Sequence, residues 1–306
     1  MPKTYKDLAD DAGSDIGRQM AAQIERLQAR MRAIRATVAV VSGKGGVGKS
    51  AITVNLATAA ALEGSAVGIL DADLNGPSIA KMTGVRGQKL EIMAEGVQPV
   101  AGPAGLRIMS MDLLLPHDDV PVIWQAPTQT ESYMWRSSME ATALREFLSD
   151  TVWGALDMLF LDMPPGTDRI SALASLLPAL TGMIIVTIPG EVSRLVVRKA
   201  LALARDLKLP VLGLIENMVG YYCQACQAVG ELFGAGQGDA LAGHFGIPLL
   251  GQVPFEPRLA RSADNGMPFV ALHGETPVGQ AFRAIVRGLM AHLMGKEEGS
   301  MERETR

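Results

Sequence analysis

The feature that most constrains this chain is a glycine-rich segment between two apolar runs, Gly43-Lys-Gly-Gly-Val-Gly-Lys-Ser50. The run before it, Thr37–Val41, predicts a buried strand, and the run after it, Lys49–Leu62, predicts a helix. Glycines let the backbone curl so that successive N–H groups, together with the helix N-terminus, point at a phosphate. The segment therefore predicts a phosphate-binding loop, the alternative being a plain glycine-rich turn.

The side chains of this loop suit a nucleoside triphosphate. Lys49 is expected to reach the β and γ phosphates, and the Ser50 hydroxyl is expected to be a magnesium ligand. We therefore expect ATP and Mg²⁺ as cofactors. The residues predicted to contact the nucleotide are Gly43, Lys44, Gly45, Gly46, Val47, Gly48, Lys49 and Ser50.

The rest of the chain alternates short apolar runs with helical patterns. Such alternation predicts βαβ units, and hence an α/β P-loop NTPase whose mostly parallel sheet carries helices on both faces. The low aromatic content, 5%, suits helices packed on a parallel sheet. Further strands are expected at Ala66–Leu70, Met158–Leu161, Met183–Ile188, Val211–Ile215 and Leu249–Val253, and further helices at Ile170–Leu176, Glu191–Leu207 and Gly238–Phe245.

Three regions are expected along the chain: a leader helix in residues 1–36, the ATPase domain in 37–294 and a charged tail in 295–306. The leader is predicted to dock on the domain through one apolar stripe, with a short coiled coil or partner contact as the alternative. Residues 85–136 predict a hairpin and loops over the active face, and Val278–Met294 predicts an amphipathic helix. The leader stripe comprises Ile16, Met20, Ile24, Leu27, Met31 and Ile34.

Charge and hydropathy exclude several classes of protein. A formal net charge of −4 argues against a nucleic-acid-coating protein. No apolar run reaches the length of a membrane span, and the N-terminus has no export-signal pattern. The chain holds two cysteines, three positions apart, which is no disulfide framework. We therefore expect a cytoplasmic protein without a membrane span and without a nucleic-acid partner.

Three aspartates follow two of the predicted strands. In open parallel sheets, ligands bind beyond the carboxyl ends of the strands, so acids placed there are candidates for the site. Asp162 fits a Walker B acid that holds magnesium, and Asp73 fits a metal-side or water-positioning acid. Asp71 is expected to be the structural member of its pair. Ordinary loop-capping roles are the alternative for each.

A lysine early in the loop distinguishes this sequence from an ordinary Walker A motif. The pattern Lys44-Gly-Gly-Val-Gly-Lys-Ser50 resembles the deviant Walker A class, which includes the nitrogenase iron protein, MinD, ParA and the Mrp/ApbC proteins. The resemblance implies a homodimer in which Lys44 reaches the nucleotide bound by the partner. There it would neutralise charge that develops during phosphoryl transfer.

Further motifs are similar to one branch of this class, the Mrp/ApbC family. That family comprises ATP-dependent carriers that pass a 4Fe-4S cluster to apo-proteins, so the resemblance implies this activity and these partners. It also implies that Asn217 recognises the adenine and that the Pro254 loop packs near the base. The motifs are Asp71-Ala-Asp-Leu-Asn-Gly-Pro-Ser78, Asp162-Met-Pro-Pro-Gly-Thr167, Glu216-Asn-Met218, Cys223-Gln-Ala-Cys226, Leu250-Gly-Gln-Val-Pro254 and Asp264-Asn-Gly-Met-Pro268.

The cysteines fit this interpretation if two chains cooperate. A 4Fe-4S cluster usually needs four thiolates, and a symmetric dimer supplies two from each chain, Cys223 and Cys226. A shared zinc site, a redox pair or an inert pair are the alternatives for these residues. A MinD- or ParA-like positioning or regulatory ATPase with a specialised client is the alternative function.

Two motifs depart from the family pattern. The family's Trp-Arg-Gly-Pro element reads Trp124-Gln-Ala-Pro127 here, which loses a charge and a flexible residue near the expected dimer face. After the Walker B acid the family usually reads Pro-Pro-Gly-Thr-Gly-Asp, whereas this chain reads Pro164-Pro-Gly-Thr-Asp-Arg169. A glycine is missing or replaced, so Asp168 is displaced from the position of the family's acid. Small misplacements can lower a reaction rate by on the order of a hundredfold. We therefore predict tight ATP binding with slow turnover.

Overall fold

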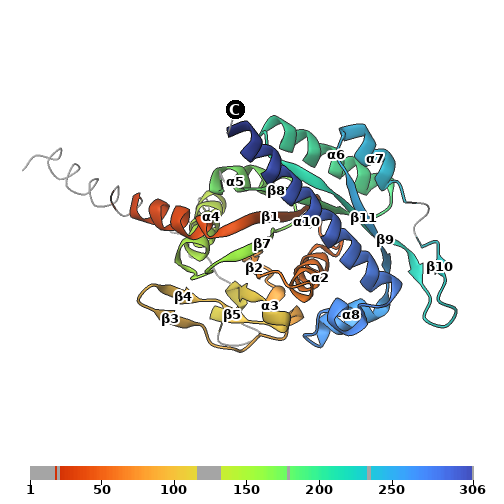
Figure 1. Cartoon of the computed structure of the whole chain (residues 1–306), viewed down its shortest axis with the longest axis horizontal. Helices are drawn as coiled ribbons and strands as arrows, with labels where there is room; N and C mark the ends of the chain where they lie inside the picture. The colour runs from red at the N-terminus through yellow and green to blue at the C-terminus, as the bar shows by residue number, and fades with distance from the viewer. Residues whose placement is uncertain (1–17, 19–20, 116–131, 178–179, 233–235, 305–306) are drawn as a thin grey trace, which may run out of the picture.

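The computed structural model of the chain describes residue 18 and residues 21–115, 132–177, 180–232 and 236–304. Within them lies a nine-stranded sheet in the order β10-β9-β8-β1-β7-β2-β6-β5, with β11 paired to β9 (Figure 1). The pairs β1–β7, β1–β8, β8–β9, β9–β11, β2–β7 and β2–β6 are parallel. Only β5 and β10 pair antiparallel in the described part of this sheet. The predicted fold class is confirmed.

The elements of the first half are β1 (Ile34–Ser42), α2 (Lys49–Leu62), β2 (Val67–Asp71), α3 (Ile79–Met82), β3 (Glu91–Met93), β4 (Gly96–Gln98), β5 (Val100–Ala101) and β6 (Arg107–Met109), with 3-10 turns at Pro103–Gly105 and Met111–Leu114. Those of the second half are α4 (Ser132–Asp150), β7 (Leu156–Asp162), α5 (Asp168–Leu176), β8 (Gly182–Thr187), α6 (Glu191–Asp206), β9 (Val211–Tyr222), β10 (Val229–Gly230), α7 (Gly238–Phe245), β11 (Leu249–Phe255), α8 (Pro257–Asp264), α9 (Phe269–His273) and α10 (Pro277–Glu304).

The sheet separates two apolar cores. Because side chains alternate along a strand, Val38 and Val40 of β1 enter one core, while Ala39 and Val41 enter the other. Helices α2, α9 and α10 cover the first face, and α4, α5, α6 and α7 cover the second (Figure 1). Each large apolar side chain buried in these layers contributes about 1.5–3 kcal/mol. The P-loop strand β1 is therefore held from both sides.

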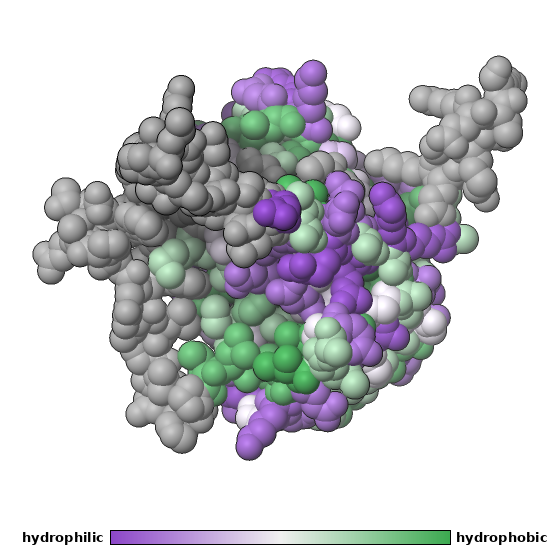
Figure 2. All heavy atoms as spheres, turned by 90° about the vertical axis from the view of Figure 1, so that its left-hand side faces the viewer, coloured by the Kyte–Doolittle hydropathy of each residue, from purple (hydrophilic) through white to green (hydrophobic). Residues whose placement is uncertain are grey.

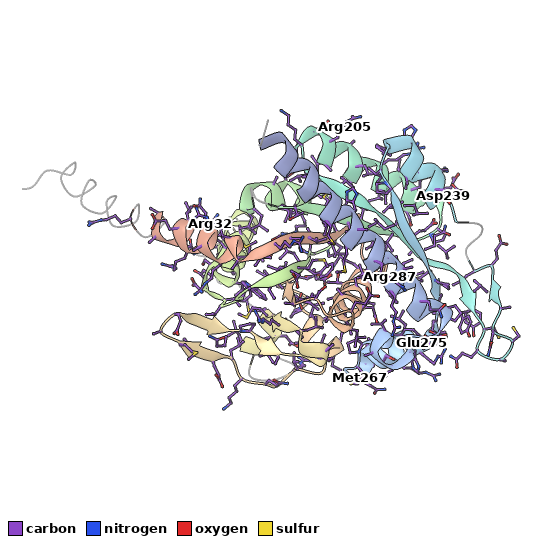
Figure 3. The ribbon with its side chains drawn as sticks, viewed as in Figure 1. Arg32, Arg205, Asp239, Met267, Glu275 and Arg287 are labelled. Atoms are coloured by element: carbon purple, nitrogen blue, oxygen red, sulfur yellow. The ribbon has the colours of Figure 1, made fainter. Side chains whose placement is uncertain are left out.

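Polar contacts at the helix ends supplement this packing. Arg287 of α10, labelled in Figure 3, pairs with Glu63, the residue that follows α2, at 3.5 Å between Nε and Oε1. The Arg287 side chain is 65% exposed and the Arg205 side chain, near the end of α6, is 76% exposed, so the ion pairs of both lie at the surface. The Arg287–Glu63 contact joins α10 to the end of α2, two helices that cover the same face of the sheet.

The helix over residues 21–32 docks on the domain, as predicted for the leader. Leu27 and Met31 are buried in the core that includes α4, whereas Ile24 is 46% exposed. Arg30 donates to the carbonyls of Glu95 and Ser149. Ile16 and Met20 lie outside the described residues.

One member of the predicted stripe lies elsewhere. Ile34 belongs to β1, where it pairs with Leu156, because the sheet register overrides a spacing that also fits a helix. The strand accordingly begins before Thr37. Figure 2 shows the side of the molecule that carries the leader helix. Apolar surface is visible in the lower part of this view, at the level of the β3–β4 hairpin. In that hairpin Ile92 is 81% exposed.

Two further regions differ from the predicted pattern. The hairpin expected within residues 85–136 is β3–β4, while 116–131 lie outside the described residues. The 19-residue helix α4 has no counterpart among the predicted elements, and α10 continues past Met294 to Glu304. None of the described helices is long and apolar enough to cross a lipid bilayer.

Candidate functional site

The glycine-rich loop connects β1, in the middle of the sheet, to α2. Gly46 and Gly48 have φ angles of 78° and 82°, in the left-handed region that glycine tolerates best. A Cβ on Gly48 would also lie 2.4 Å from Nδ2 of Asn217, so only glycine fits there without a shift. The first turn of α2 has no acidic residue. The loop therefore has the backbone shape and helix N-terminus that a phosphate group requires.

Asp162 lies at the end of β7 directly behind this loop. Its carboxylate is 2.7 Å from the Lys49 ammonium and accepts hydrogen bonds from the Ser50 and Thr53 hydroxyls, at 2.6 and 2.7 Å. The side chains of Lys49 and Asp162 are 7% and 0% exposed. Such a buried charge is tolerated because it is paired and fully hydrogen-bonded. The structure thus brings together Lys49, Ser50 and Asp162, whose separate roles remain predictions.

The two acids after β2 differ in their surroundings. Asp71 is buried and accepts hydrogen bonds from the backbone N–H groups of Ser78 and Ile79 and from the Ser110 hydroxyl. Burial, and next the nearby Asp162 carboxylate, raise the pKa of Asp71 to about 7, whereas the two backbone hydrogen bonds oppose that rise. These contacts fit the structural role expected for Asp71.

Asp73 is more accessible. It is half-buried, and its carboxylate accepts from the backbone N–H of Gly76 at 3.2 Å. Its loop follows β2, which is adjacent to β7 in the sheet, with Asp71 in register with Asp162. The loop of Asp73 therefore starts beside the Lys49–Asp162 pair, at the carboxyl end of the sheet where a ligand is expected.

Asn217 and Pro254 lie on the adjacent strands β9 and β11. Asn217 of β9 pairs in register with Val253 of β11, and Pro254 is the residue after Val253. The Asn217 amide donates to the carbonyl of Val47 in the phosphate-binding loop at 2.9 Å and is almost buried. Adenine recognition by Asn217 and packing by Pro254 remain predictions; of the two, Asn217 contacts the loop directly.

Lys44 sits on the accessible side of the loop. Its backbone carbonyl accepts from the Ser42 hydroxyl at 3.0 Å, and the side chain is half-buried beside the exposed Gly45 and Gly46. Among the described residues no carboxylate forms an ion pair with its ammonium. The position leaves Lys44 able to contact a second molecule.

The two cysteines occupy the turn between β9 and β10. The turn is closed by hydrogen bonds from Cys223 N to Ala228 O and from Gln227 N to Cys223 O, with Gln227 in the left-handed region at φ 58°. Cys226 is exposed and Cys223 is half-buried. Backbone N–H groups of Cys226 and Ala225 lower the pKa of the Cys223 thiol, which favours the thiolate that binds metals. The described residues contain no group of three or more acidic, His or Cys side chains placed to hold a metal ion.

Strand β9 carries both Asn217 and the tyrosine that precedes Cys223. Between them, Met218 and Gly220 have φ angles of 59° and 76°. A Cβ on Gly220 would lie 2.6 Å from the carbonyl oxygen of Gly230, so this glycine allows β10 to pair closely. One strand thus extends from the phosphate-binding loop to the cysteine turn.

The loop after β7 carries the departure from the family pattern. Gly166 has φ 119°, and α5 begins at Asp168, whose side chain is 67% exposed. Arg169, in the first turn of α5, pairs with Glu140 at 2.6 Å and lies 3.5 Å from the Asp168 carboxylate. The Asp168 carboxylate is thus directed to Arg169 and solvent.

A family model described as the ParA, NUBPL iron-transfer P-loop NTPase matches residues 33–290. The chain belongs to this family. The resemblance to P-loop iron–sulfur carrier ATPases drawn from the motifs is thereby confirmed, together with the P-loop NTPase fold. Membership of this family of P-loop NTPases supports nucleotide binding by the chain, whereas the residues that contact the nucleotide remain predictions.

Curated relatives and solved structures agree with this assignment. An iron-sulfur cluster carrier protein of Saccharolobus solfataricus is 44% identical over 87% of both chains, and one of Methanocaldococcus jannaschii is 40% identical over 93% of this chain and 94% of its own. A nucleotide-binding protein of Archaeoglobus fulgidus, solved with ADP, is 36% identical with a TM-score of 0.66, covering 79% of this chain and 90% of that one. MinD of Aquifex aeolicus, at 21% identity and TM-score 0.56 over 84% and 97%, shares the fold.

Three residues that hydrogen-bond to side chains of the candidate nucleotide site were not identified from the sequence: Thr53, Ser110 and Glu140. Thr53 could have been found, because it lies one helical turn after Lys49 and therefore on the same face of α2. Ser110 and Glu140 reach the site through β6 and α4, elements that no local motif marks.

Proposed function

We propose that this chain is an ATP-dependent carrier of a 4Fe-4S cluster, working in the cytoplasm as a homodimer and delivering the cluster to apo-proteins. The observation that carries the proposal is the cysteine turn on β9, at the exposed end of a strand that also contacts the phosphate-binding loop through Asn217. Because β9 connects the two sites, the state of the nucleotide could be transmitted along this strand to the cysteines. The carriers to which the chain is 40–44% identical support the cargo class.

The nucleotide site would work by positioning. Lys49 would exchange its partner Asp162 for the β and γ phosphates, and Ser50 and Asp162 supply the oxygen ligands that Mg²⁺ prefers. Bound Mg²⁺ would neutralise charge on the phosphates. Asp73 would orient water, and Lys44 of one chain would contact the nucleotide of the other.

The cargo site would need both chains of the dimer. Each chain contributes two thiols, of which Cys223 is the more readily ionised, and a 4Fe-4S cluster usually takes four thiolates. In the reducing cytoplasm these thiols stay available.

Anaerobic reconstitution with iron and sulfide tests the cargo directly. We expect four iron and four sulfide per dimer, with a brown chromophore, as the stoichiometry of such a cluster requires. Cys223→Ala and Cys226→Ala should each abolish the chromophore and leave binding of a fluorescent ATP analogue intact. A chromophore that survives in the double variant, or one zinc per dimer with no iron, would overturn the proposal. Bound nucleotide without any cargo would favour the positioning ATPase instead.

We also propose that turnover is slow. Asp168 is exposed and paired with Arg169 on the surface, and Gly166 is the last glycine before α5. Inserting a glycine between Thr167 and Asp168 should speed steady-state phosphate release. If the unaltered chain turns over briskly and the insertion slows it, the loop is a working variant and this part of the proposal is wrong.

A further inference from the structure

Glu140, on α4, connects two loops of the nucleotide site with one carboxylate. Its Oε1 accepts a hydrogen bond from the Asn75 amide at 2.7 Å, and its Oε2 accepts from Arg169 at 2.6 Å. Glu140 is 8% exposed. A carboxylate so far from water requires hydrogen-bond donors such as these.

The two loops leave neighbouring strands. Asn75 lies two residues after Asp73, in the loop between β2 and α3, and Arg169 lies in the first turn of α5, the helix that follows the loop after β7. The strands β2 and β7 are adjacent and parallel, and Asp162 is the last residue of β7. The carboxylate of Glu140 therefore joins the loop that carries Asp73 to the start of the helix that follows the Asp162 loop.

A cavity of about 260 Å³ lies beside this contact. Apolar side chains of both loops line it, among them Leu74 from the first and Met163 from the second, and Glu140, Asn75 and Arg169 form its polar part. The cavity leaves room for the loops to shift, so packing alone does not fix their separation. At the base of the loops the Ala72 N–H donates to the Asp162 carbonyl at 3.0 Å, and further out the hydrogen bonds of Glu140 provide a side-chain connection.

We propose that Glu140 is a positioning residue, which makes the Asp73 loop and the loop after Asp162 move as one unit when nucleotide binds. Its effect on hydrolysis rests on the proposed ATPase function. The mechanical connection itself can be measured without hydrolysis. Glu140 touches no nucleotide atom in this scheme and acts through Asn75 and Arg169.

Hydrogen–deuterium exchange of the full-length protein, with and without ADP, tests the connection. Glu140→Gln keeps the shape of the side chain but cannot hold both the Asn75 amide and the Arg169 guanidinium as the carboxylate does. We expect exchange in residues 73–78 and 164–172 to rise together, about threefold or more. Glu146→Gln is the matched control, because Glu146 is an exposed carboxylate on the same helix. Wild-type exchange in both loops of Glu140→Gln, or the same rise in Glu146→Gln, would overturn the proposal.

Steady-state phosphate release over a range of ATP concentrations supplies the second measurement. We expect Glu140→Gln to lower kcat about tenfold while KM for ATP stays within about twofold, since the phosphate contacts are unchanged. Arg169→Lys, which keeps the charge, should retain more activity than Arg169→Ala. A raised KM with unchanged kcat, or equal rates for the two Arg169 variants, would contradict a positioning role. If the wild type hydrolyses no ATP, the proposed function fails, and the exchange measurement alone decides the connection.

Discussion

Replacing Lys49 by alanine should weaken the fold as well as ATP binding. The change leaves the Asp162 carboxylate, 0% exposed, without the ammonium that lies 2.7 Å away. Removing one partner of a buried pair costs about 3–5 kcal/mol, but hydrogen bonds to a charged acceptor contribute about 1.5–3 kcal/mol each, and those from Ser50 and Thr53 remain. We therefore expect a loss of about 2–3 kcal/mol in the free energy of unfolding.

Urea unfolding without nucleotide, followed by circular dichroism, measures this loss. Lys49→Met keeps most of the apolar stem and isolates the effect of the charge. Adding Asp162→Asn to Lys49→Ala should recover about 1 kcal/mol or more, because the unpaired charge is then gone. If Lys49→Ala unfolds at the wild-type midpoint, or the double variant is no more stable than the single one, the buried pair does not act as described.

The same variant tests the nucleotide site. In conditions where Lys49→Ala is folded, titration with a fluorescent ATP analogue should show a severe loss of affinity, because this ammonium is the side-chain cation expected at the phosphates. Lys49→Met should show a similar loss. Undiminished affinity in both variants would refute the assignment of the loop.

Three further outcomes are expected. Lys44→Ala should weaken ATP-dependent dimerisation in light scattering more visibly than it lowers phosphate release; an unchanged dimer would contradict the cross-chain role. Cys223 should be alkylated by iodoacetamide at lower pH than an ordinary thiol, since backbone N–H groups and, less strongly, the Cys226 thiol lower its pKa. Cys226→Ala removes only the thiol contact and should move this profile to higher pH by part of the difference; superimposed profiles would be inconsistent with the thiol contact. Between pH 3.8 and about 7, Asp71 is protonated in the folded state but ionised in the unfolded state. The wild type should therefore lose stability relative to Asp71→Asn as the pH rises through that range. A constant difference between the two in urea unfolding would refute the raised pKa.

The glycine-rich loop with its flanking strand and helix was predictable because these elements follow one another in the chain. The loop, α2 and the acids at the strand ends are each marked by a local pattern, and parallel strands bring their carboxyl ends to one edge. Helix α2 begins and ends where the sequence places it, at Lys49 and Leu62. The cores on the two faces likewise follow from the alternation within β1.

Contacts that depend on packing across elements were not predictable. Glu140 lies on α4, whose buried side chains in its second half, such as Leu144 and Leu148, mark a helix only once the sheet they cover is known. Ile34 fits a helical spacing, yet hydrogen bonding to β7 places it in a strand. The cysteine motif gave the chemistry of the turn but not its position at the end of β9.

The length of β9 between its two contacts has a consequence for protein engineering. Five residues separate Asn217 from Cys223. After the left-handed residues Met218 and Gly220, Tyr221 and Tyr222 pair with β10, and side chains alternate along such a pair. Adding or deleting one residue beside this pair would turn the side chains that follow to the opposite face. Tyr222, now buried, would face outward, and the thiols would be carried to the other side of the sheet edge. A chimera that exchanges the cysteine turn must therefore preserve this interval, whereas the residues of the turn itself can change.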